Sequence, residues 1–285
     1  MSTLEAVVLG IVQGLTEFLP VSSSAHLRIV PALLGWSDPG AAYSAVIQCG
    51  TLAAVCLALR HDISKLIWGC LAALRMGRPL GTPEARLAAL IVLGTVPIVV
   101  AGFTFKQLIR GEARQLAVVV AALLAATALM AIAELACLRR SRRTGSPGRD
   151  GLDRVGFSDG VGMGLAQMLA LVPGTSRSGI TISVGMLTGL DRRTAARFSF
   201  LLSLPAVAAA AILEAWQQRH EILGDDVWAT LVGTLTAGIV GYVSIQWLLR
   251  MLTGHTLWPF IVYRLGLATL LVWMLAAGWI AAPAA

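Results

Sequence analysis

The stretch Gln13-Gly-Leu-Thr-Glu17-Phe-Leu-Pro20-Val-Ser22-Ser23-Ser24-Ala-His26 interrupts an apolar sequence with polar residues and a proline. A second stretch repeats the order of glutamine, proline and hydroxyl cluster: Gln167-Met-Leu-Ala-Leu-Val-Pro173-Gly174-Thr175-Ser176-Arg177-Ser178-Gly179. The first stretch adds a carboxylate and an imidazole, and the second adds a guanidinium. Ionisable side chains inside apolar spans are expensive and mark functional sites. Together the two stretches indicate acid–base chemistry facing an anion clamp.

The composition is that of an integral membrane protein. Hydrophobic residues make up 57% of the chain and charged residues 13%, and the mean hydropathy is +0.78. A helical span needs about 20 apolar residues. Six ranges meet this requirement: 41–59, 87–105, 115–138, 197–215, 227–249 and 258–281. We therefore predict an all-α polytopic membrane protein with six transmembrane helices.

The two interrupted segments differ from these spans. They cover residues 3–35 and 157–190, and Pro, Ser, Thr and Gly break each of them near the middle. At about 1.5 Å of rise per residue, each half of such a segment reaches only partway across a bilayer. Broken backbone at membrane depth is tolerated where protein encloses it. The sequence therefore predicts two re-entrant helical hairpins.

The order of the elements predicts an inverted repeat. A hairpin and three spans fill residues 1–138, a basic linker fills 139–156, and a second hairpin and three spans fill 157–285. Three spans are an odd number, so the second unit is inverted relative to the first. Inverted repeats with broken helices place a binding site near the midplane. The hairpins are then expected to enter from opposite faces and to meet tip to tip.

Basic residues predict the orientation. Arginines crowd residues 139–156 and recur in 60–86, whereas the opposite connections hold fewer basic residues or mix them with acidic ones. The positive-inside rule puts the arginine-rich connections in the cytoplasm and both termini outside, so the first hairpin opens to the exterior. The net charge of +7 is mostly this topological signal. Nucleic-acid binding is not predicted, because these arginines flank the predicted spans.

The first hairpin carries candidate catalytic residues. Gln13 and Glu17 are four residues apart and share one helix face. A carboxylate in this apolar setting must be paired, metal-bound or protonated. After Pro20, the alternative to a catalytic role for Ser22, Ser23 and Ser24 is that one of them caps the next helix. The alternative for His26 is a core histidine bonded to a backbone carbonyl.

The second hairpin has the features of an anion site. Gly174 lets the backbone approach a ligand, and amides at a restarting helix point toward it. Arg177 supplies a bidentate fork suited to phosphate oxygens. The alternative role of Arg177 is a buried salt bridge to Glu17, which would also bring the two hairpins into contact. The hydroxyl groups expected to add donors belong to Thr175, Ser176, Ser178 and Thr181. Gln48 and Gln167 are more typical of interhelical hydrogen bonds.

These residues resemble the undecaprenyl-diphosphate phosphatases of the bacitracin-resistance type. The resemblance rests on Gln13-x-x-x-Glu17 followed by Pro-Val-Ser-Ser and His26, and on Pro-Gly-Thr-Ser-Arg-Ser-Gly. It extends over essentially the full length, including Phe198-Ser-Phe-Leu-Leu-Ser-Leu-Pro205. The family pattern allows Glu or Gln at its first position, and this chain has Gln13. Only Glu17 therefore supplies a carboxylate in this motif.

The resemblance implies a bacterial cytoplasmic (inner) membrane hydrolase that converts undecaprenyl diphosphate to the monophosphate and phosphate. That reaction recycles the lipid carrier for cell-wall synthesis and confers bacitracin resistance. Members of the family are activated by a divalent cation, Mg²⁺ or Ca²⁺. The expected partners are the polyprenyl diphosphate and the bilayer, and the oligomeric state stays open between monomer and homodimer. An active site facing the periplasm follows from the predicted orientation.

The residue chemistry agrees with this activity but leaves the nucleophile open. Arg177 and nearby amides would bind the phosphates, and Glu17 would hold the cation with Gln13 as a neutral ligand. His26 would act as general acid/base or as nucleophile. Ser23, activated by His26 and oriented by Ser22, is the competing nucleophile. Water activated by the metal and Glu17 is the third route.

A lipid-phosphate flippase or anion transporter is the alternative function, since inverted repeats with broken midplane helices are typical of transporters. The group of Glu17, Ser23 and His26 separates the two hypotheses. A transporter needs the anion clamp but no nucleophile with an acid–base partner.

Accessibility labelling tests the predicted orientation. Single cysteines in a cysteine-free background, Gly145→Cys and Ile222→Cys, are expected to be labelled from the cytoplasm and from the exterior, respectively. The measurement is labelling by a membrane-impermeant maleimide in intact and permeabilised cells. The reverse pattern would invert the topology.

Overall fold

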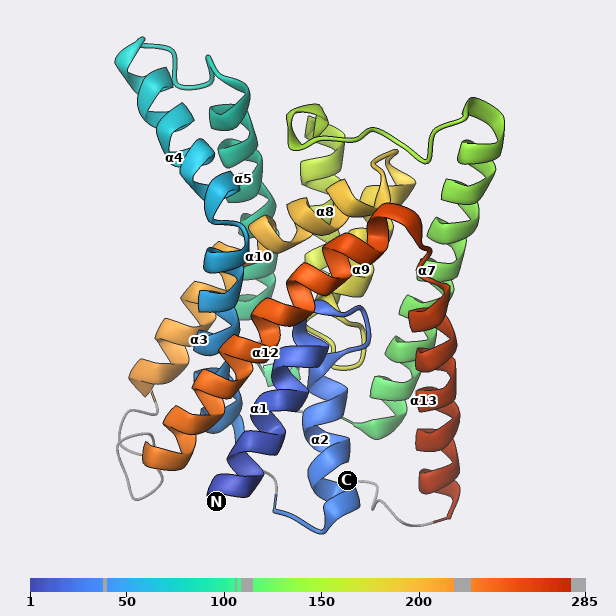
Figure 1. The fold of residues 1–285 in the computed structure, drawn as a ribbon. Coiled ribbons are helices and arrows are strands. Elements are labelled where there is room, and N and C mark those ends of the chain that lie inside the picture. The colour runs from blue at the N-terminus through green and yellow to red at the C-terminus, as the bar shows by residue number, and fades with distance from the viewer. Residues whose placement is uncertain (38–39, 106, 109–114, 218–226, 278–285) are drawn as a thin grey trace.

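The computed structural model describes residues 1–37, 40–105, 107–108, 115–217 and 227–277, and these residues fold as helices without a strand (Figure 1). The first half contains α1 (Thr3–Phe18), α2 (Ser23–Leu34), α3 (Gly40–Ala58), α4 (Arg60–Arg75), α5 (Pro83–Thr104) and α7 (Leu116–Thr144). The second half contains the short 3₁₀ helix η2 (Leu152–Arg154), α8 (Phe157–Leu169), α9 (Arg177–Leu187), α10 (Arg192–Gln217), α12 (Val227–Gly254) and α13 (Trp258–Ala276). The predicted all-α class is confirmed.

Several helices are suited to crossing a membrane, as the sequence predicts. Five described helices are long and apolar enough to span: α5, α7, α10, α12 and α13. The bent pair α3–α4, with an angle of 73° at the break, brings the number to as many as six. The protein is therefore a multi-pass membrane protein, while the arrangement of six spans and two re-entrant hairpins stays a prediction. The sequence treated α4 as part of a connection, and it is a helix that continues α3 at an angle.

Two helix pairs lie where the hairpins are predicted. The helix α1 ends at Phe18 and α2 begins at Ser23, whereas α8 ends at Leu169 and α9 begins at Arg177. In Figure 1, α1 rises from the end that holds the N-terminus, and α8 descends from the opposite end. The tips touch in the interior, where the Ser178 hydroxyl donates to the Leu19 carbonyl at 3.2 Å. The two breaks therefore form one buried junction.

Glycines let each hairpin approach a long helix closely. A Cβ added to Gly14 of α1 would lie 2.8 Å from the Ala237 carbonyl oxygen of α12. A Cβ added to Gly164 of α8 would lie 2.5 Å from the Cα of Gly94 in α5. Real Cβ contacts essentially never come this close. Small residues of this kind allow backbones to pack together inside a membrane.

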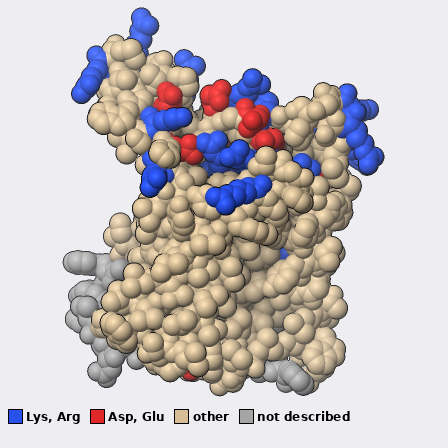
Figure 2. Space-filling view, in the orientation of Figure 1, with Lys and Arg blue, Asp and Glu red and all other residues tan. Residues whose placement is uncertain are grey.

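Charged side chains gather at one end of the molecule (Figure 2). This end holds residues 139–156, which the sequence predicts to be a basic linker. In the structure α7 continues to Thr144, and Arg149 forms two hydrogen bonds to the buried Asp159 carboxylate of α8, at 2.8 and 3.0 Å. The Arg149 amide also donates to the Gly189 carbonyl at 2.8 Å. The connection is thus held against α8 and α9, because its arginine has a buried partner.

Equivalent positions recur in the two hairpins. Gln13 and Gln167 lie on α1 and α8, and Ser22 and Ser176 precede α2 and α9, with the same separation along the chain in both cases. Packing recurs as well, since α1 lies on α12 and α8 lies on α5. An inverted repeat produces such correspondences. The boundaries of the repeats, 1–138 and 157–285, stay a prediction.

The close α5–α8 contact predicts a steric effect of a single methyl group. Gly164→Ala places a Cβ against the α5 backbone, and we expect it to lower stability by about 1–3 kcal/mol, as overpacking does. Gly266→Ala in α13 is the matched control, because nothing lies within 4 Å of its added Cβ. Thermal unfolding in detergent measures both variants. Equal unfolding temperatures for the two would contradict this packing.

Candidate functional site

Glu17 lies at the centre of the junction between the two hairpin tips. Its Oε1 accepts a hydrogen bond from Arg177 Nη2 at 2.6 Å, which is also an ion pair. Its Oε2 accepts from Ser23 Oγ at 2.7 Å and from Gln13 Nε2 at 3.1 Å. Charge-assisted hydrogen bonds of this length are strong. The carboxylate therefore joins α1, the start of α2 and the start of α9.

Two serines hold the sharp backbone turns that place these side chains. Ser22 and Ser176 are the non-glycine residues with positive φ in the described chain, at 78° and 69°. This backbone conformation costs an ordinary residue about 1–2 kcal/mol. Each serine immediately precedes a helix, so Ser23 and Arg177 are both first helical residues. The strained turns thus aim a hydroxyl and a guanidinium into the same junction.

Capping, the alternative role of the three serines, is not made by a side chain in the described first hairpin. Ser22 is the N-cap residue of α2 but makes no side-chain capping bond, and its hydroxyl lies 3.2 Å from Ser24 Oγ. The Ser23 hydroxyl is occupied by Glu17 instead. Side-chain capping occurs in the second hairpin, where Ser176 Oγ accepts from the Gly179 amide at 3.2 Å. The hydroxyls of the first hairpin are therefore available for other chemistry.

A cavity of about 200 Å³ opens beside this junction. Its polar wall consists of Glu17, Ser22, Ser23, Ser24, Gln48, Ser176 and Arg177. Its remaining wall consists of Ile98, Ala170, Ala206, Val207 and Ala210. A ligand with an anionic head and an apolar tail matches this division. The hydroxyls and the guanidinium would meet the head, and α5 and α10 would meet the tail.

The cavity lies far from the charged end of the molecule. The helix α10 begins at Arg192 near that end, and Ala210 lies roughly 27 Å further along the helix, at 1.5 Å per residue. Ile98 likewise lies toward the end of α5, which begins at Pro83. The cavity is therefore nearer to the end that holds Thr3 and Ala276 (Figure 1).

His26 lies behind the junction. Its Nδ1 is 2.7 Å from the Ser22 carbonyl oxygen, so Nδ1 carries the proton and donates. Its Nε2 then accepts from the Tyr263 hydroxyl at 2.6 Å. Both ring nitrogens therefore have hydrogen-bond partners. His26 is not among the described residues that line the cavity. This placement matches the sequence alternative of a core histidine bonded to a backbone carbonyl.

Several predicted phosphate donors also lie behind the cavity wall. Thr181 Oγ1 donates to the Arg177 carbonyl at 2.7 Å and lies 2.6 Å from Ser199 Oγ. Ser178 Oγ donates to Leu19, and Thr175 is only 4% exposed. The Gly174 amide donates to Ser24 Oγ at 3.4 Å. Of the predicted donors in the second hairpin, only Ser176 and Arg177 line the cavity. The others fix the turn that carries them.

Two buried atoms at the junction lack partners. Gln13 Oε1 and Arg177 Nη1 are buried without a hydrogen bond. An unpaired buried donor or acceptor is costly, so both atoms are candidates for ligand contacts. The described residues contain no group of three or more His, Cys, Asp or Glu that could hold a metal ion. A site of one carboxylate and one amide oxygen nevertheless suits Mg²⁺, which commonly completes its shell with water and substrate phosphates.

Sequence reasoning missed three residues near the site. Gln48 was predicted to form a hydrogen bond between helices, but it lines the cavity. Tyr263 and Arg264 of α13 contact His26 and the hairpin tips. A signal for Arg264 exists, because it is a lone charge in the last apolar span and such charges mark functional sites. Tyr263 gives no such signal, since tyrosine is common in membrane proteins.

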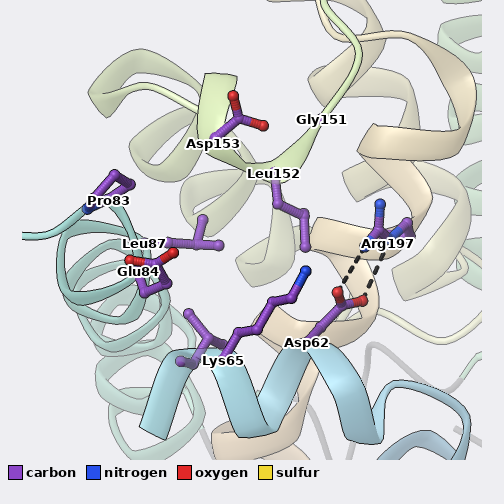
Figure 3. A pocket seen from close by; sticks show the side chains of 10 residues that line it. Asp62, Lys65, Pro83, Glu84, Leu87, Gly151, Leu152, Asp153 and Arg197 are labelled. Atoms are coloured by element: carbon purple, nitrogen blue, oxygen red, sulfur yellow. Dashed lines mark hydrogen bonds and ion pairs between the residues drawn. The ribbon is translucent and has the colours of Figure 1, made fainter. Parts of the chain in front are cut away.

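A second cavity, of about 240 Å³, lies at the charged end (Figure 3). Arg197 and Asp62 pair across it at 2.6 Å, and Lys65 of α4 points into it. The predicted site residues do not line it. The first cavity is therefore the candidate active site.

Comparison with known proteins agrees with this geometry. Residues 6–270 match the family described as bacitracin resistance protein BacA. The chain belongs to the BacA family. Curated relatives named undecaprenyl-diphosphatase include those of Chlorobaculum tepidum, 49% identical over 98% of this chain and 99% of the relative, and Chlorobium limicola, 47% identical over 99% and 100%. A third, from Chlorobium phaeobacteroides, is 46% identical over 99% and 100%. The resemblance seen in the sequence is confirmed.

The BacA match covers both hairpins and the helices around them. It begins within α1 and ends within α13, so Glu17, Arg177 and Arg264 all lie inside it. The site residues therefore lie within the part of the chain that matches the BacA family.

The Glu17–Arg177 pair predicts a coupled effect on stability. Arg177→Met leaves a buried carboxylate unpaired and is expected to destabilise the protein by about 3–5 kcal/mol. Adding Glu17→Gln should recover part of that loss, because the unpaired charge is gone. A double-mutant cycle measured by unfolding in detergent tests the contact. Additive losses in the double variant would show that the side chains do not interact.

Proposed function

We propose that this protein hydrolyses undecaprenyl diphosphate to undecaprenyl phosphate and inorganic phosphate. The observation that carries the proposal is the hydrogen bond from Ser23 to Glu17 at 2.7 Å, at the wall of a cavity that also presents Arg177. A hydroxyl, a carboxylate and a guanidinium thus lie together, which supports roles for them as nucleophile, base and anion-binding group. The names of the curated relatives and the membership of the BacA family support the same substrate.

Ser23 is the proposed nucleophile. Its hydroxyl donates to Glu17, so the carboxylate can take the proton as the oxygen attacks the terminal phosphorus. The P–O bond to the bridging oxygen breaks, and undecaprenyl phosphate leaves with the electron pair. The serine proton then passes from Glu17 to the departing undecaprenyl phosphate, which leaves the carboxylate free to deprotonate a water. That water attacks the phosphoserine, the Ser23 oxygen leaves and regains a proton, and phosphate is released. The bonding of both His26 nitrogens to Ser22 and Tyr263 favours this route over attack by His26.

Arg177 is the proposed charge stabiliser. Its Nη2 is bound to Glu17, while its buried Nη1 has no partner. Phosphoryl transfer depends mainly on positioning and on neutralising charge at the phosphate oxygens. The free Nη1 would donate to those oxygens, together with the Ser176 hydroxyl. A divalent cation, Mg²⁺ or Ca²⁺, would be held by Glu17 and Gln13 Oε1 and would neutralise further phosphate charge.

The cavity walls support a lipid substrate. The apolar residues of α5 and α10 would receive the first isoprenoid units while the diphosphate meets the hairpin tips. In the proposed orientation the arginine-rich end is cytoplasmic, so the cavity faces the periplasm of a bacterial inner membrane. The product would return to cell-wall synthesis, and the loss of undecaprenyl diphosphate would give bacitracin resistance. A transporter would need the arginine but not the Ser23–Glu17 pair.

A phosphate-release assay tests the activity. Wild-type protein in detergent is expected to release phosphate from undecaprenyl diphosphate, and chelation of divalent cations should suppress the release. Ser23→Ala should lower kcat by roughly 10³-fold or more, as loss of a nucleophile does. Ser244→Ala is the matched control, because that hydroxyl donates to Val240 of its own helix. No release by folded wild type across several cations would overturn the function.

Trapping the intermediate separates the three chemical routes. Protein quenched during turnover of substrate labelled with ³²P in the terminal phosphate should carry acid-stable label, as phosphoserine does. Ser23→Ala should remove it. Acid-labile label would indicate His26, and unlabelled protein during rapid turnover would indicate direct attack by water.

A further inference from the structure

Arg264 is a buried cation that bonds to both hairpin tips. It lies on α13 and is 0% exposed. Its Nη1 donates to the Pro20 carbonyl at 3.3 Å, and its Nη2 contacts the Gly174 and Thr175 carbonyls at 3.2 and 3.1 Å. It also donates to two oxygen atoms of α7, the Leu123 carbonyl and Thr127 Oγ1. The side chain therefore donates hydrogen bonds to five oxygen atoms. One planar side chain thus contacts the first hairpin, the second hairpin and α7.

The charge of Arg264 has no acidic partner among the described residues. Two partly buried arginines do have one, since Arg177 pairs with Glu17 and Arg192 pairs with Glu134. A buried charge is costly unless it is paired and hydrogen-bonded. Arg264 donates the hydrogen bonds but lacks the counter-charge among the described residues. Stability alone does not account for a cation at this place, because an uncharged donor would avoid the cost.

The carbonyls that Arg264 binds lie close to the reacting groups. Pro20 precedes the strained turn at Ser22 that carries Ser23, and Thr175 precedes the strained turn at Ser176 that carries Arg177. The guanidinium is rigid and planar, so its donors have fixed relative positions. Holding these carbonyls therefore fixes the position of Ser23 relative to Arg177. Tyr263, the preceding residue on α13, reinforces the first turn through His26.

From these contacts we propose that Arg264 is a positioning residue for phosphoryl transfer and that its uncompensated charge attracts the diphosphate. The proposal rests on the proposed function. Arg264 does not line the cavity in the described chain, so it acts through the two tips and through its electric field. Among these three side chains Glu17 and Arg177 neutralise each other, so Arg264 gives the junction one positive charge before any cation binds. A polyanionic substrate would supply the missing counter-charge.

Two substitutions separate the hydrogen bonds from the charge. Arg264→Met loses both, and we expect kcat to fall by about 10²-fold, the size that follows from a small misplacement of reacting groups. Its KM should rise by about tenfold, because one Coulomb attraction is lost. Arg264→Lys keeps the charge but cannot reach both tips with a fixed fork. Its KM should return toward the wild-type value, while kcat stays depressed by about tenfold.

Milder and matched variants keep this test decisive if Arg264→Met does not fold. Thr127→Val removes the acceptor for Arg264 Nε, together with the hydrogen bond that the Thr127 hydroxyl donates to Leu123 of its own helix, and should lower kcat several-fold without changing KM. Arg192→Met is the structural control. It removes another buried arginine, away from the tips, and should lower the unfolding temperature while the folded protein keeps its kcat.

The kinetic constants with undecaprenyl diphosphate, measured beside thermal unfolding, decide the outcome. A split between kcat and KM in Arg264→Lys, with an unfolding temperature near that of wild type, supports the proposal. Wild-type kcat in folded Arg264→Met or Arg264→Lys overturns it. A lower unfolding temperature with an unchanged kcat of the folded protein, the result expected for Arg192→Met, overturns it as well. A wild-type protein without activity would instead overturn the proposed function.

Discussion

The structure depends on one constraint, which is that broken backbone inside an apolar environment must find hydrogen-bond partners. Each hairpin ends partway through the molecule and exposes peptide groups where its helix stops. The other hairpin and Arg264 bind these groups. The Leu19 carbonyl accepts a hydrogen bond from the Ser178 hydroxyl, and the Gly174 amide donates one to Ser24 Oγ. Arg264 donates hydrogen bonds to carbonyls of both tips. The contacts that allow the chain to fold are therefore the ones that assemble the site.

Strain is concentrated at the same junction. Positive φ angles at Ser22 and Ser176 are unfavourable for serine, and such conformations persist only where the surroundings impose them. A relaxed turn would rotate the first residue of the following helix away from Glu17. Hydrogen bonds on both sides of each turn hold the strained form. The geometry that brings Ser23 and Arg177 to one carboxylate is thus maintained by the packing of the entire junction.

Much of the fold follows from sequence because span length and helix breaks are local properties. Runs of apolar residues set the helices, and Pro20 and Pro173 set the interruptions. The sequence offered the contact between Glu17 and Arg177 as the alternative to a free phosphate-binding fork, since two opposite charges in an apolar setting need each other. The direction in which each side chain points could not be predicted from local sequence in the same way. Thr181 and His26 turn behind the cavity and Gln48 turns into it, because packing against distant helices sets each rotation.

The two hairpins are alike in backbone and different in chemistry. Ser23 and Arg177 occupy the same position, the first helical residue after a strained serine. One repeat thus presents a hydroxyl where the other presents a guanidinium. Glu17 has an apolar counterpart, Leu171, so only one base exists for the pair. Two equivalent turns that meet at one carboxylate give a single asymmetric site. This explains why the hairpins must meet tip to tip, since neither repeat holds a nucleophile, a base and an anion clamp by itself.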